Sequence, residues 1–203
     1  MSSRSPSRRR FLCAAATAAA PLPLGGALAH AEARARTDTD WMGDWPSPLR
    51  AAVRAAMPVA VRHARASAKW PFGAVLVDPA DGAVVAGAGN SSESGDPTAH
   101  AEVNLLRSAA AAGIDLPGHV LVSTAEPCPM CAGALLWGGV RAVAYGTSIA
   151  RLIAWGVPQI DVPLTELVRK SLLPRPSVAR AVRTEITDPL YRSLSRATGD
   201  SHV

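Results

Sequence analysis

Two short segments, 96–102 and 126–131, constrain the fold of this 203-residue chain more than any other part of it. The first contains His100 and the second contains Cys128 and Cys131, and all three side chains are typical zinc ligands. A catalytic zinc site has three protein ligands and keeps a fourth position open. Glu102 is not needed as a ligand and is free to transfer protons beside such a site. The chain must fold so that the two segments meet, and we predict that they bind Zn²⁺.

We expect a helix to begin in each segment. Asp96 is a suitable N-cap, and the proline after it suits the first helical position, so His100 would lie early in a helix. Pro127 suits the first position of a second helix, which would place Cys128 and Cys131 in its first turn and on one face. A helix N-terminus favours the thiolate, the form of cysteine that binds metal.

Two other interpretations of Cys128 and Cys131 stay open. In an exported protein the pair could form a disulfide or a thioredoxin-like redox centre. A structural zinc site is a further alternative, but it requires a fourth ligand. The remaining histidines have no local ligand spacing: His30, His63, His119 and His202.

Hydrophobic periodicity predicts an α/β fold, with a sheet covered on both faces. The predicted elements, in chain order, are helix 48–67, strands 72–77 and 83–89, helix 100–112, strand 120–124, the cysteine helix, which ends at 138–139, and strand 140–146. Ser47 is expected to cap the first helix, and Pro58 to kink or split it. The two strands at 72–89 are expected to form a hairpin.

The C-terminal third has weaker patterns. We expect a helix or a lid over the site at 148–160, a short helix at 164–173, a last strand at 182–186 and a final helical turn or two at 189–196. Residues 47–203 would form one domain with this C-terminal lid region. Residues 30–46 are predicted to be a linker or arm, with Trp41 and Trp45 available to pack onto the domain.

The first 29 residues have the pattern of an export signal. Residues 7–12 (SRRRFL) resemble the twin-arginine signature, and an apolar run and a possible A-x-A cleavage site at 27–29 follow. We expect a signal peptide at 1–29, a role for the twin-arginine export machinery, and a periplasmic or secreted protein. The apolar run is too short to span a membrane, and no later stretch reaches its length without charges or breakers. An uncleaved anchor and a chance arginine cluster are the alternatives.

The charge of the chain depends on this segment. The whole sequence carries 21 basic and 16 acidic residues, and residues 1–29 contain four arginines and no acid. Removing them would leave 17 basic against 16 acidic residues, a net charge of +1. A nearly neutral domain is a poor match for a protein that binds a phosphate backbone, so nucleic acid is not an expected partner.

Residues 71–147 resemble the cytidine deaminase-like zinc hydrolases, in the branch that holds bacterial guanine deaminases and tRNA adenosine deaminases. The matching segments are 71–75 (PFGAV), Asn90, 96–103 (DPTAHAEV) and 126–131 (EPCPMC). The resemblance implies a three-layer α/β/α fold with a central five-stranded mixed sheet, bound Zn²⁺ and a homodimer. Hydrolytic deamination would use zinc-activated water, with Glu102 as the proton shuttle.

The same resemblance implies substrate-binding residues. Asn90 would hydrogen-bond the ring, and Phe72 and Trp137 would lie near the base. The backbones of Ala101 and Cys128 would meet the polar edge of the substrate. The expected partner is therefore a small nucleobase or nucleoside.

Within this branch, the segment 71–73 and the cysteine segment with Trp137 look closer to guanine deaminases than to tRNA enzymes. One departure concerns an acidic run that guanine deaminases carry after the fourth strand: residues 148–156 contain no acid, and the next is Asp161. Adenine-type, cytosine-type and triazine rings therefore stay open beside guanine. Two alternatives remain: a tRNA adenosine deaminase, and a non-catalytic exported redox protein that uses Cys128 and Cys131.

Overall fold

The computed structural model describes residues 45–67 and 69–198, with the side chains placed up to residue 194. The predicted signal peptide, Trp41 and most of the predicted arm lie outside the described residues. The described helices are α2 (Ser47–Arg65), α3 (Ala101–Ala111), α4 (Pro129–Trp137), α5 (Ile149–Ala154), α6 (Leu164–Lys170) and α7 (Thr184–Thr198). The strands are β1 (Gly73–Val77), β2 (Val84–Gly89), β3 (Val120–Ala125), β4 (Ala142–Thr147) and β5 (Ser177–Ala179).

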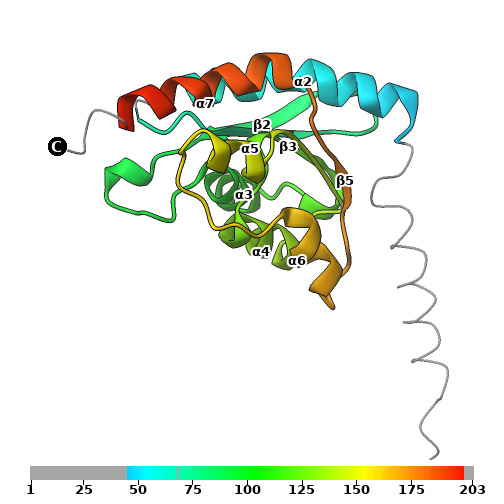
Figure 1. Ribbon diagram of the computed structural model, residues 1–203. Coiled ribbons are helices and arrows are strands. Elements are labelled where there is room, and N and C mark those ends of the chain that lie inside the picture. Colours follow the sequence, from blue (N-terminus) through cyan, green and yellow to red (C-terminus); the bar gives the residue numbers. More distant parts are fainter. Residues whose placement is uncertain (1–44, 68, 199–203) are drawn as a thin grey trace, which may run out of the picture.

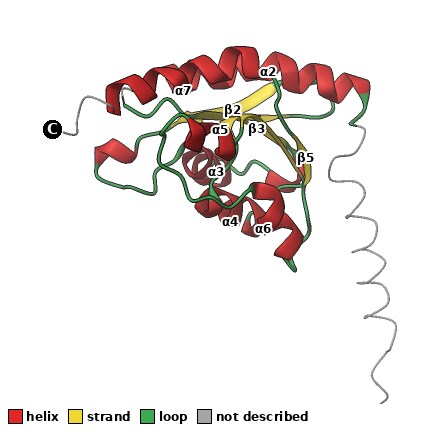
Figure 2. Ribbon diagram, viewed as in Figure 1, coloured by secondary structure: helices red, strands yellow, loops and turns green. Residues whose placement is uncertain are grey.

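The strands form one five-stranded mixed sheet in the order β2-β1-β3-β4-β5. β1 pairs antiparallel with β2 and with β3, whereas β3, β4 and β5 run parallel. Helices α2 and α7 lie across one face of this sheet, and α3, α4 and α6 lie on the other (Figures 1 and 2). The predicted three-layer α/β/α fold with a five-stranded mixed sheet is thus confirmed.

Small residues bring the layers close together on the α2 side. A Cβ atom on Gly73 would lie 2.2 Å from the carbonyl oxygen of Ala60, so only glycine lets β1 approach α2 this closely. Met57 and Val53 of α2 are buried against Val75 of β1 and Val122 of β3. On the opposite face of the sheet, the buried sides of α3, α4 and α6 pack against the strands and form a second core.

The sequence predicted a kink or break at Pro58, but α2 is one continuous helix from residue 47 to residue 65. A proline has no N–H to donate to the carbonyl four residues earlier, which here belongs to Arg54. The Arg183 guanidinium donates to that carbonyl instead, at 3.3 Å, which compensates for the missing bond. Ser47 is the first helical residue rather than the cap, which is Pro46.

The largest error of sequence reasoning lies near the C-terminus. A strand was expected at 182–186, but β5 lies earlier, at 177–179, and α7 begins at Thr184. Ala181 and Arg183 both have φ of 56°, a left-handed conformation that breaks a strand and that usually needs glycine. Because neither residue is glycine, the sequence gives no sign of this turn. α7 also continues through Pro189, so it is longer than the turn or two expected.

Among the described residues, no helix combines the length and the apolar character that a membrane crossing would need.

Candidate active site

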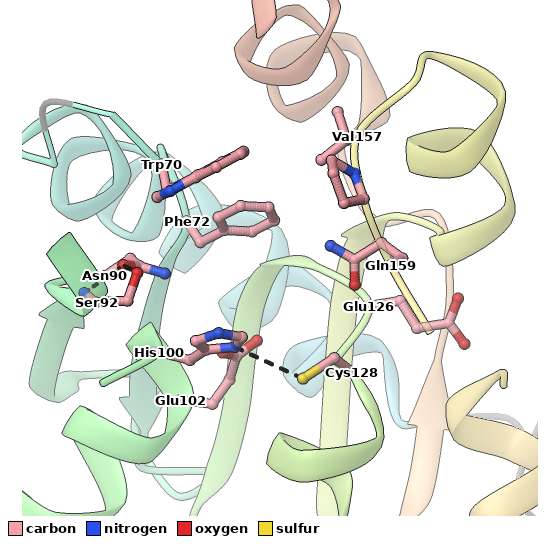
Figure 3. Close-up of a pocket in the computed structure, with 11 residues that line it drawn as sticks. Trp70, Phe72, Asn90, Ser92, His100, Glu102, Glu126, Cys128, Val157 and Gln159 are labelled. Atoms are coloured by element: carbon pink, nitrogen blue, oxygen red, sulfur yellow. Dashed lines mark hydrogen bonds between the residues drawn. The ribbon is translucent and has the colours of Figure 1, made fainter. Parts of the chain in front are cut away.

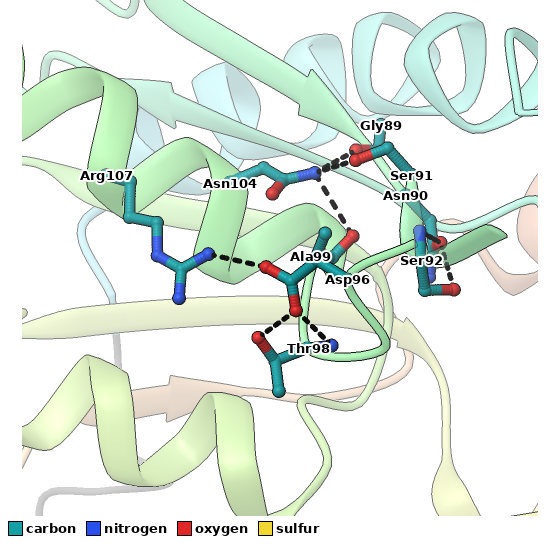
Figure 4. A network of polar contacts seen from close by, with 9 residues as sticks. All are labelled: Gly89, Asn90, Ser91, Ser92, Asp96, Thr98, Ala99, Asn104 and Arg107. Carbon is teal, nitrogen blue, oxygen red and sulfur yellow. Dashed lines mark hydrogen bonds and ion pairs between the residues drawn. The ribbon is translucent and has the colours of Figure 1, made fainter. Parts of the chain in front are cut away.

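The histidine segment reaches the site through a turn that precedes α3. Asp96 was predicted to cap the helix, but it does not. Its Oδ1 accepts hydrogen bonds from the backbone and the hydroxyl of Thr98 instead, at 2.8 and 2.6 Å. These bonds lower the pKa of Asp96. The N-cap is His100 itself, with extended backbone (φ −70°, ψ 155°), so α3 starts one residue after the ligand. The side chain of Arg107, a residue of α3, pairs with Asp96 at 3.3 Å and closes the turn (Figure 4).

Asn104 ties the histidine segment to the end of β2. Its Nδ2 donates to the carbonyl of Gly89 at 3.0 Å, the hydroxyl of Ser91 at 3.0 Å and the carbonyl of Ala99 at 3.1 Å (Figure 4). Asn90, between the first two of these residues, is buried. One side chain of α3 thus positions both a metal ligand and Asn90, a role that the sequence analysis did not assign.

The cysteine helix begins later than expected. α4 starts at Pro129, not at Pro127, and Cys128 is its N-cap. Cys131 lies in the first turn and is buried, whereas Cys128 is half-buried. The correction has a simple reason: both prolines suit a first helical position, and the sequence alone does not separate them. Each half of the motif thus presents a ligand at the N-cap of its helix.

The three ligand atoms form a nearly equilateral triangle. The sulfur atoms of Cys128 and Cys131 lie 3.6 Å from each other, and each lies 3.6 Å from His100 Nδ1. Around a tetrahedral zinc with Zn–S of about 2.3 Å and Zn–N of about 2.0–2.1 Å, such atoms are about 3.5–3.8 Å apart. The donor set and its spacing therefore fit a zinc ion, and the triangle leaves a fourth position open.

The two thiols are free and unequal. A sulfur–sulfur distance of 3.6 Å is far longer than the roughly 2.05 Å of a disulfide. The hydrogen bond between the two sulfur atoms lowers the pKa of Cys128 to about 4, with further help from His100. The same bond, together with burial, raises the pKa of Cys131. The hydrogen bond with Cys128 also raises the pKa of His100. A metal cation would replace this shared proton and draw both sulfurs into the thiolate form.

Glu102 is held beside the ligand triangle by β3. The Ser123 hydroxyl donates to Glu102 Oε1 at 2.8 Å, and Cys131 Sγ lies 3.4 Å from Oε2. The side chain is 4% exposed, and burial raises its pKa, against the lowering effect of the Ser123 bond. One carboxylate oxygen is thus anchored, and the other faces the site where protons would be exchanged.

A cavity of about 140 Å³ opens over this group. Its lining comprises Trp70, Phe72, Asn90, Ser92, His100, Glu102, Glu126, Cys128, Val157, Pro158 and Gln159. Figure 3 shows His100, Glu102 and Cys128 at one end, Trp70 and Phe72 at the other, and Asn90 facing Gln159 across the space. The cavity thus combines a metal-ligand set, a buried carboxylate and apolar walls.

The structure brings together most of the predicted site residues. His100, Cys128, Cys131 and Glu102 converge, and Asn90 and Phe72 line the cavity. Ala101 is the first residue of α3; its side chain is fully buried in the core and does not line the cavity. Trp137 lies elsewhere: it is the last residue of α4, at the far end from Cys128, is 82% exposed and is not among the residues that line the cavity.

Sequence reasoning missed the other side of the cavity. Val157, Pro158 and Gln159 lie in the predicted lid region, but no pattern identified which of its residues face the site. Trp70 and Phe72 both lie just before β1, and the position of Trp70 next to the PFG segment was a usable signal. The role of Ser123 as the partner of Glu102 had no signal, because the two residues meet only through the packing of α3 on the sheet.

Comparisons with known proteins agree with this geometry. Residues 47–147 match the family profile described as the cytidine and deoxycytidylate deaminase zinc-binding region. A solved structure from a study of A-to-I editing by tRNA:A34 deaminases at the wobble position is 30% identical, with a TM-score of 0.55 over 66% of this chain and 96% of that chain. The chain belongs to the cytidine and deoxycytidylate deaminase family.

Relatives within this deaminase family differ in their substrates. Guanine deaminase of Bacillus subtilis is 42% identical over 96 residues, which are 46% of this chain and 60% of that protein. A probable cytosine deaminase of Schizosaccharomyces pombe is 38% identical over 103 residues, 51% of this chain and 62% of that protein. The chain thus spans about three fifths of the length of these two curated relatives. The zinc-binding region of the family and the His100–Cys128–Cys131 cluster together identify Zn²⁺ as the cofactor.

Proposed function

We propose that this chain is a zinc-dependent hydrolytic deaminase of a free nucleobase or nucleoside, with a guanine-type purine as the favoured substrate. The observation that carries the proposal is the ligand triangle of His100, Cys128 and Cys131, open towards a cavity that also contains the buried Glu102. Membership of the deaminase family supports the reaction class.

When bound, zinc supplies a Lewis acid that makes water nucleophilic near neutral pH. Glu102 moves the protons in this proposal. Its Oε1 is fixed by Ser123, so Oε2 is the atom that takes a proton from water and passes it to a ring nitrogen and then to the departing amine. Water adds to the ring carbon and the C–N bond breaks, so a carbonyl replaces the amino group and ammonia leaves. The raised pKa of Glu102 favours a carboxyl group that can hold the proton between the two transfers.

The cavity favours a small, flat and uncharged substrate. Its volume of about 140 Å³ is well below the roughly 300–1,000 Å³ of pockets for drug-sized ligands. Trp70, Phe72 and Val157 supply apolar walls that suit the faces of a ring. Among the residues that line the cavity there is no lysine or arginine, the side chains that usually bind a phosphate. These properties support a base or nucleoside over a nucleotide.

Guanine is the favoured ring because the segment 71–73 and the cysteine segment look closer to guanine deaminases than to tRNA enzymes, and a guanine deaminase that is 42% identical over 96 residues supports this choice. The absence of an acid in 148–156 makes other rings the main alternatives. We would incubate the zinc-loaded chain with guanine, adenine, cytosine, a triazine and their available nucleosides, and measure ammonia release. Release from guanine alone supports the favoured substrate, and release from another ring keeps the reaction but corrects the substrate.

Glu102→Gln tests the mechanism in the same assay. The variant keeps the shape and one hydrogen bond with Ser123 but cannot accept the proton, so turnover should fall by about 10²–10⁴-fold while zinc content stays at one per chain. Glu102→Ala should behave in the same way. Full activity in either variant would exclude Glu102 as the proton shuttle.

A second candidate is tRNA adenosine deamination. The structure from the tRNA:A34 deaminase study favours it, since this chain covers 96% of that chain at 30% identity. The near-neutral charge expected after removal of residues 1–29 weighs against it. Inosine formation in tRNA, without ammonia release from any free ring, would select this candidate.

The homodimer is part of the proposal. α4 (PMCAGALLW) has no charged residue, yet Met130 is only partly buried and Trp137 is 82% exposed. A helix that is apolar all round is normally covered on all sides, and a second copy of this chain would cover these side chains. Light scattering coupled to size exclusion should give twice the chain mass, and Trp137→Glu should give the monomer mass.

Export completes the proposal. Residues 1–29 would direct the folded protein through the twin-arginine route to the periplasm or outside the cell. N-terminal sequencing of protein from a periplasmic fraction should begin near residue 30. Intact N-terminus in cytoplasmic protein would contradict export.

A further inference from the structure

The segment between α5 and α6 forms one wall of the cavity. Val157, Pro158 and Gln159 line the cavity from this segment, opposite Asn90 (Figure 3). Gln159 is half-buried, and its side chain points into the space. Within the part of the chain that the structure describes, its amide group takes part in no hydrogen bond. A half-buried carboxamide that faces a cavity without a protein partner is available to a ligand.

The other polar groups of the lining are largely engaged. Asn90 Oδ1 accepts from the backbone and the hydroxyl of Ser92, both at 2.8 Å, which leaves only its Nδ2 for a ligand. His100 and Cys128 belong to the metal set, and the carboxylate of Glu126 points away from the cavity (Figure 3). The neutral groups left to bind the edge of a ring are the two carboxamides and the indole N–H of Trp70, and of these only Gln159 offers an acceptor and a donor side by side.

Glu126 fixes the wall that carries Gln159. Its Oε2 accepts from the backbone N–H of Ile149 and its Oε1 from that of Leu164, both at 2.9 Å. Ile149 is the first residue of α5 and Leu164 the first residue of α6. One buried carboxylate thus binds both ends of the 149–164 segment, only two residues before the ligand Cys128. Because Gln159 lies within this segment, the Glu126 side chain fixes the wall that carries Gln159 relative to the metal ligands.

We propose that Gln159 is a specificity-determining residue that binds a substrate edge with one hydrogen-bond donor next to one acceptor, and that Glu126 is the positioning residue that holds it there. This inference rests on the proposed deaminase function and narrows its substrate class. The matching edge is amide-like, a ring N–H beside a carbonyl oxygen or a ring nitrogen. A carboxamide pairs with both groups of such an edge, in the way that Asn and Gln bind a base edge with two hydrogen bonds.

Gln159→Glu and Gln159→Leu test the specificity role. Glutamate has only acceptors when ionised, and leucine has neither group, so each should lower kcat/KM for the best substrate by roughly 10–100-fold, mainly through KM. Glutamate should also change the ranking of substrates, in favour of rings that present two donors. Ile160→Ala is the matched control, because Ile160 is adjacent, 61% exposed and outside the lining. An unchanged ranking and KM in both Gln159 variants would overturn the proposal.

Glu126→Gln separates positioning from general stability. Glutamine has one acceptor oxygen, so either Ile149 or Leu164 loses its partner. KM should rise and the ranking should move away from that of the wild type, as in Gln159→Leu, with zinc content retained. A variant that lowers the melting temperature but scales the rates of all substrates equally would show a purely structural role, and would overturn the positioning role.

Calorimetric binding of the same ring compounds to zinc-loaded Glu102→Gln distinguishes failure of the proposed deaminase function from failure of the role proposed for Gln159. If the wild type neither binds nor converts any ring, the proposed function fails, and this inference fails with it. If the wild type converts a ring and binding is unaffected by Gln159→Leu, only the inference fails. If binding weakens about tenfold or more when Gln159→Leu is added to Glu102→Gln, as expected from the loss of two hydrogen bonds, the role of Gln159 is supported.

Discussion

Two regions of the molecule build the site in different ways. The metal half, residues 71–147, supplies His100, Glu102, Cys128 and Cys131 from the starts of α3 and α4. The covering half, residues 148–198, supplies the wall at 157–159 and the supports behind it. The metal half takes its functional side chains from two short segments, in which the residues that act together are close in sequence. The covering half depends on single contacts between residues that are far apart in the sequence.

These distant contacts are few and specific. The hydroxyl of Tyr191 in α7 donates to Thr124 of β3 at 2.7 Å, and its ring packs on Phe72 with centroids 4.9 Å apart. Asp188, also in α7, accepts from Thr147 of β4 at 2.8 Å and pairs with Arg151 of α5 at 2.8 Å. The comparison implies that loss of a metal ligand in the metal half should abolish metal binding, whereas changes in the covering half should alter stability and substrate affinity and leave zinc in place.

The largest effect is expected for Cys131→Ala. Two remaining protein ligands are one fewer than a catalytic zinc site needs, so zinc content should fall far below one per chain and activity should drop by at least about 10³-fold. Metal analysis after dialysis, beside an ammonia assay, measures both. His119→Ala is the control, since its ring binds the carbonyl of Asp115 away from the cluster. Retained zinc and activity in Cys131→Ala would exclude the three-ligand centre.

Tyr191→Ala should have the next largest effect. It removes a fully buried aromatic side chain that joins α7 to Phe72 and Thr124, so the free energy of unfolding should fall by about 3–5 kcal/mol. Tyr191→Phe removes only the hydroxyl and should cost about 1 kcal/mol. Urea titration measures both values. Zinc should remain bound in both folded variants, and loss of zinc in folded Tyr191→Phe would show that the two halves are not separable.

The same division explains what the sequence could predict. The ligands and Glu102 were predictable because zinc chemistry limits the side chains and because His100 and the cysteine pair lie in short, recognisable segments. The sheet was predictable because β1 is a continuous apolar run and because β3 and β4 each begin with three consecutive apolar residues. Gln159 and Tyr191 were not, because their roles follow from where α5, α6 and α7 dock. The start of α7 was not predictable, because Ala181 and Arg183 form the turn before it with positive φ, and neither residue type usually adopts that conformation.

Asp188→Asn should give a smaller change. Asparagine can still accept from Thr147, but it loses the charge that pairs with the half-exposed Arg151, so the loss should be about 1 kcal/mol. Because Arg151 lies in α5, which leads into the cavity wall, KM should rise modestly while zinc content is unchanged. Thermal unfolding and steady-state kinetics measure these effects. Glu166→Gln, in an exposed pair with Lys170, is the control, and an equal rise in KM there would remove any special role for Asp188.

Arg107→Ala should have the smallest effect, although it lies in the metal half. Its pair with Asp96 is exposed on both sides, and solvent screens such pairs. The turn keeps the two bonds between Asp96 and Thr98, so His100 should stay in place. The melting temperature, zinc content and kcat/KM should all match the wild type within error. A clear loss of zinc would mean that Arg107, rather than the Asp96 turn, orients His100.

The chain order of these parts bears on how the protein acquires its metal during synthesis. His100, Glu102, Cys128 and Cys131 all precede α5, and the cavity wall at 157–159 and the helices α6 and α7 come later still. At about 5–20 residues per second, several seconds separate the emergence of Cys131 from that of Tyr191. A nascent chain can therefore take up zinc while its site is still open to solvent, and the later helices would then enclose a centre that is already loaded.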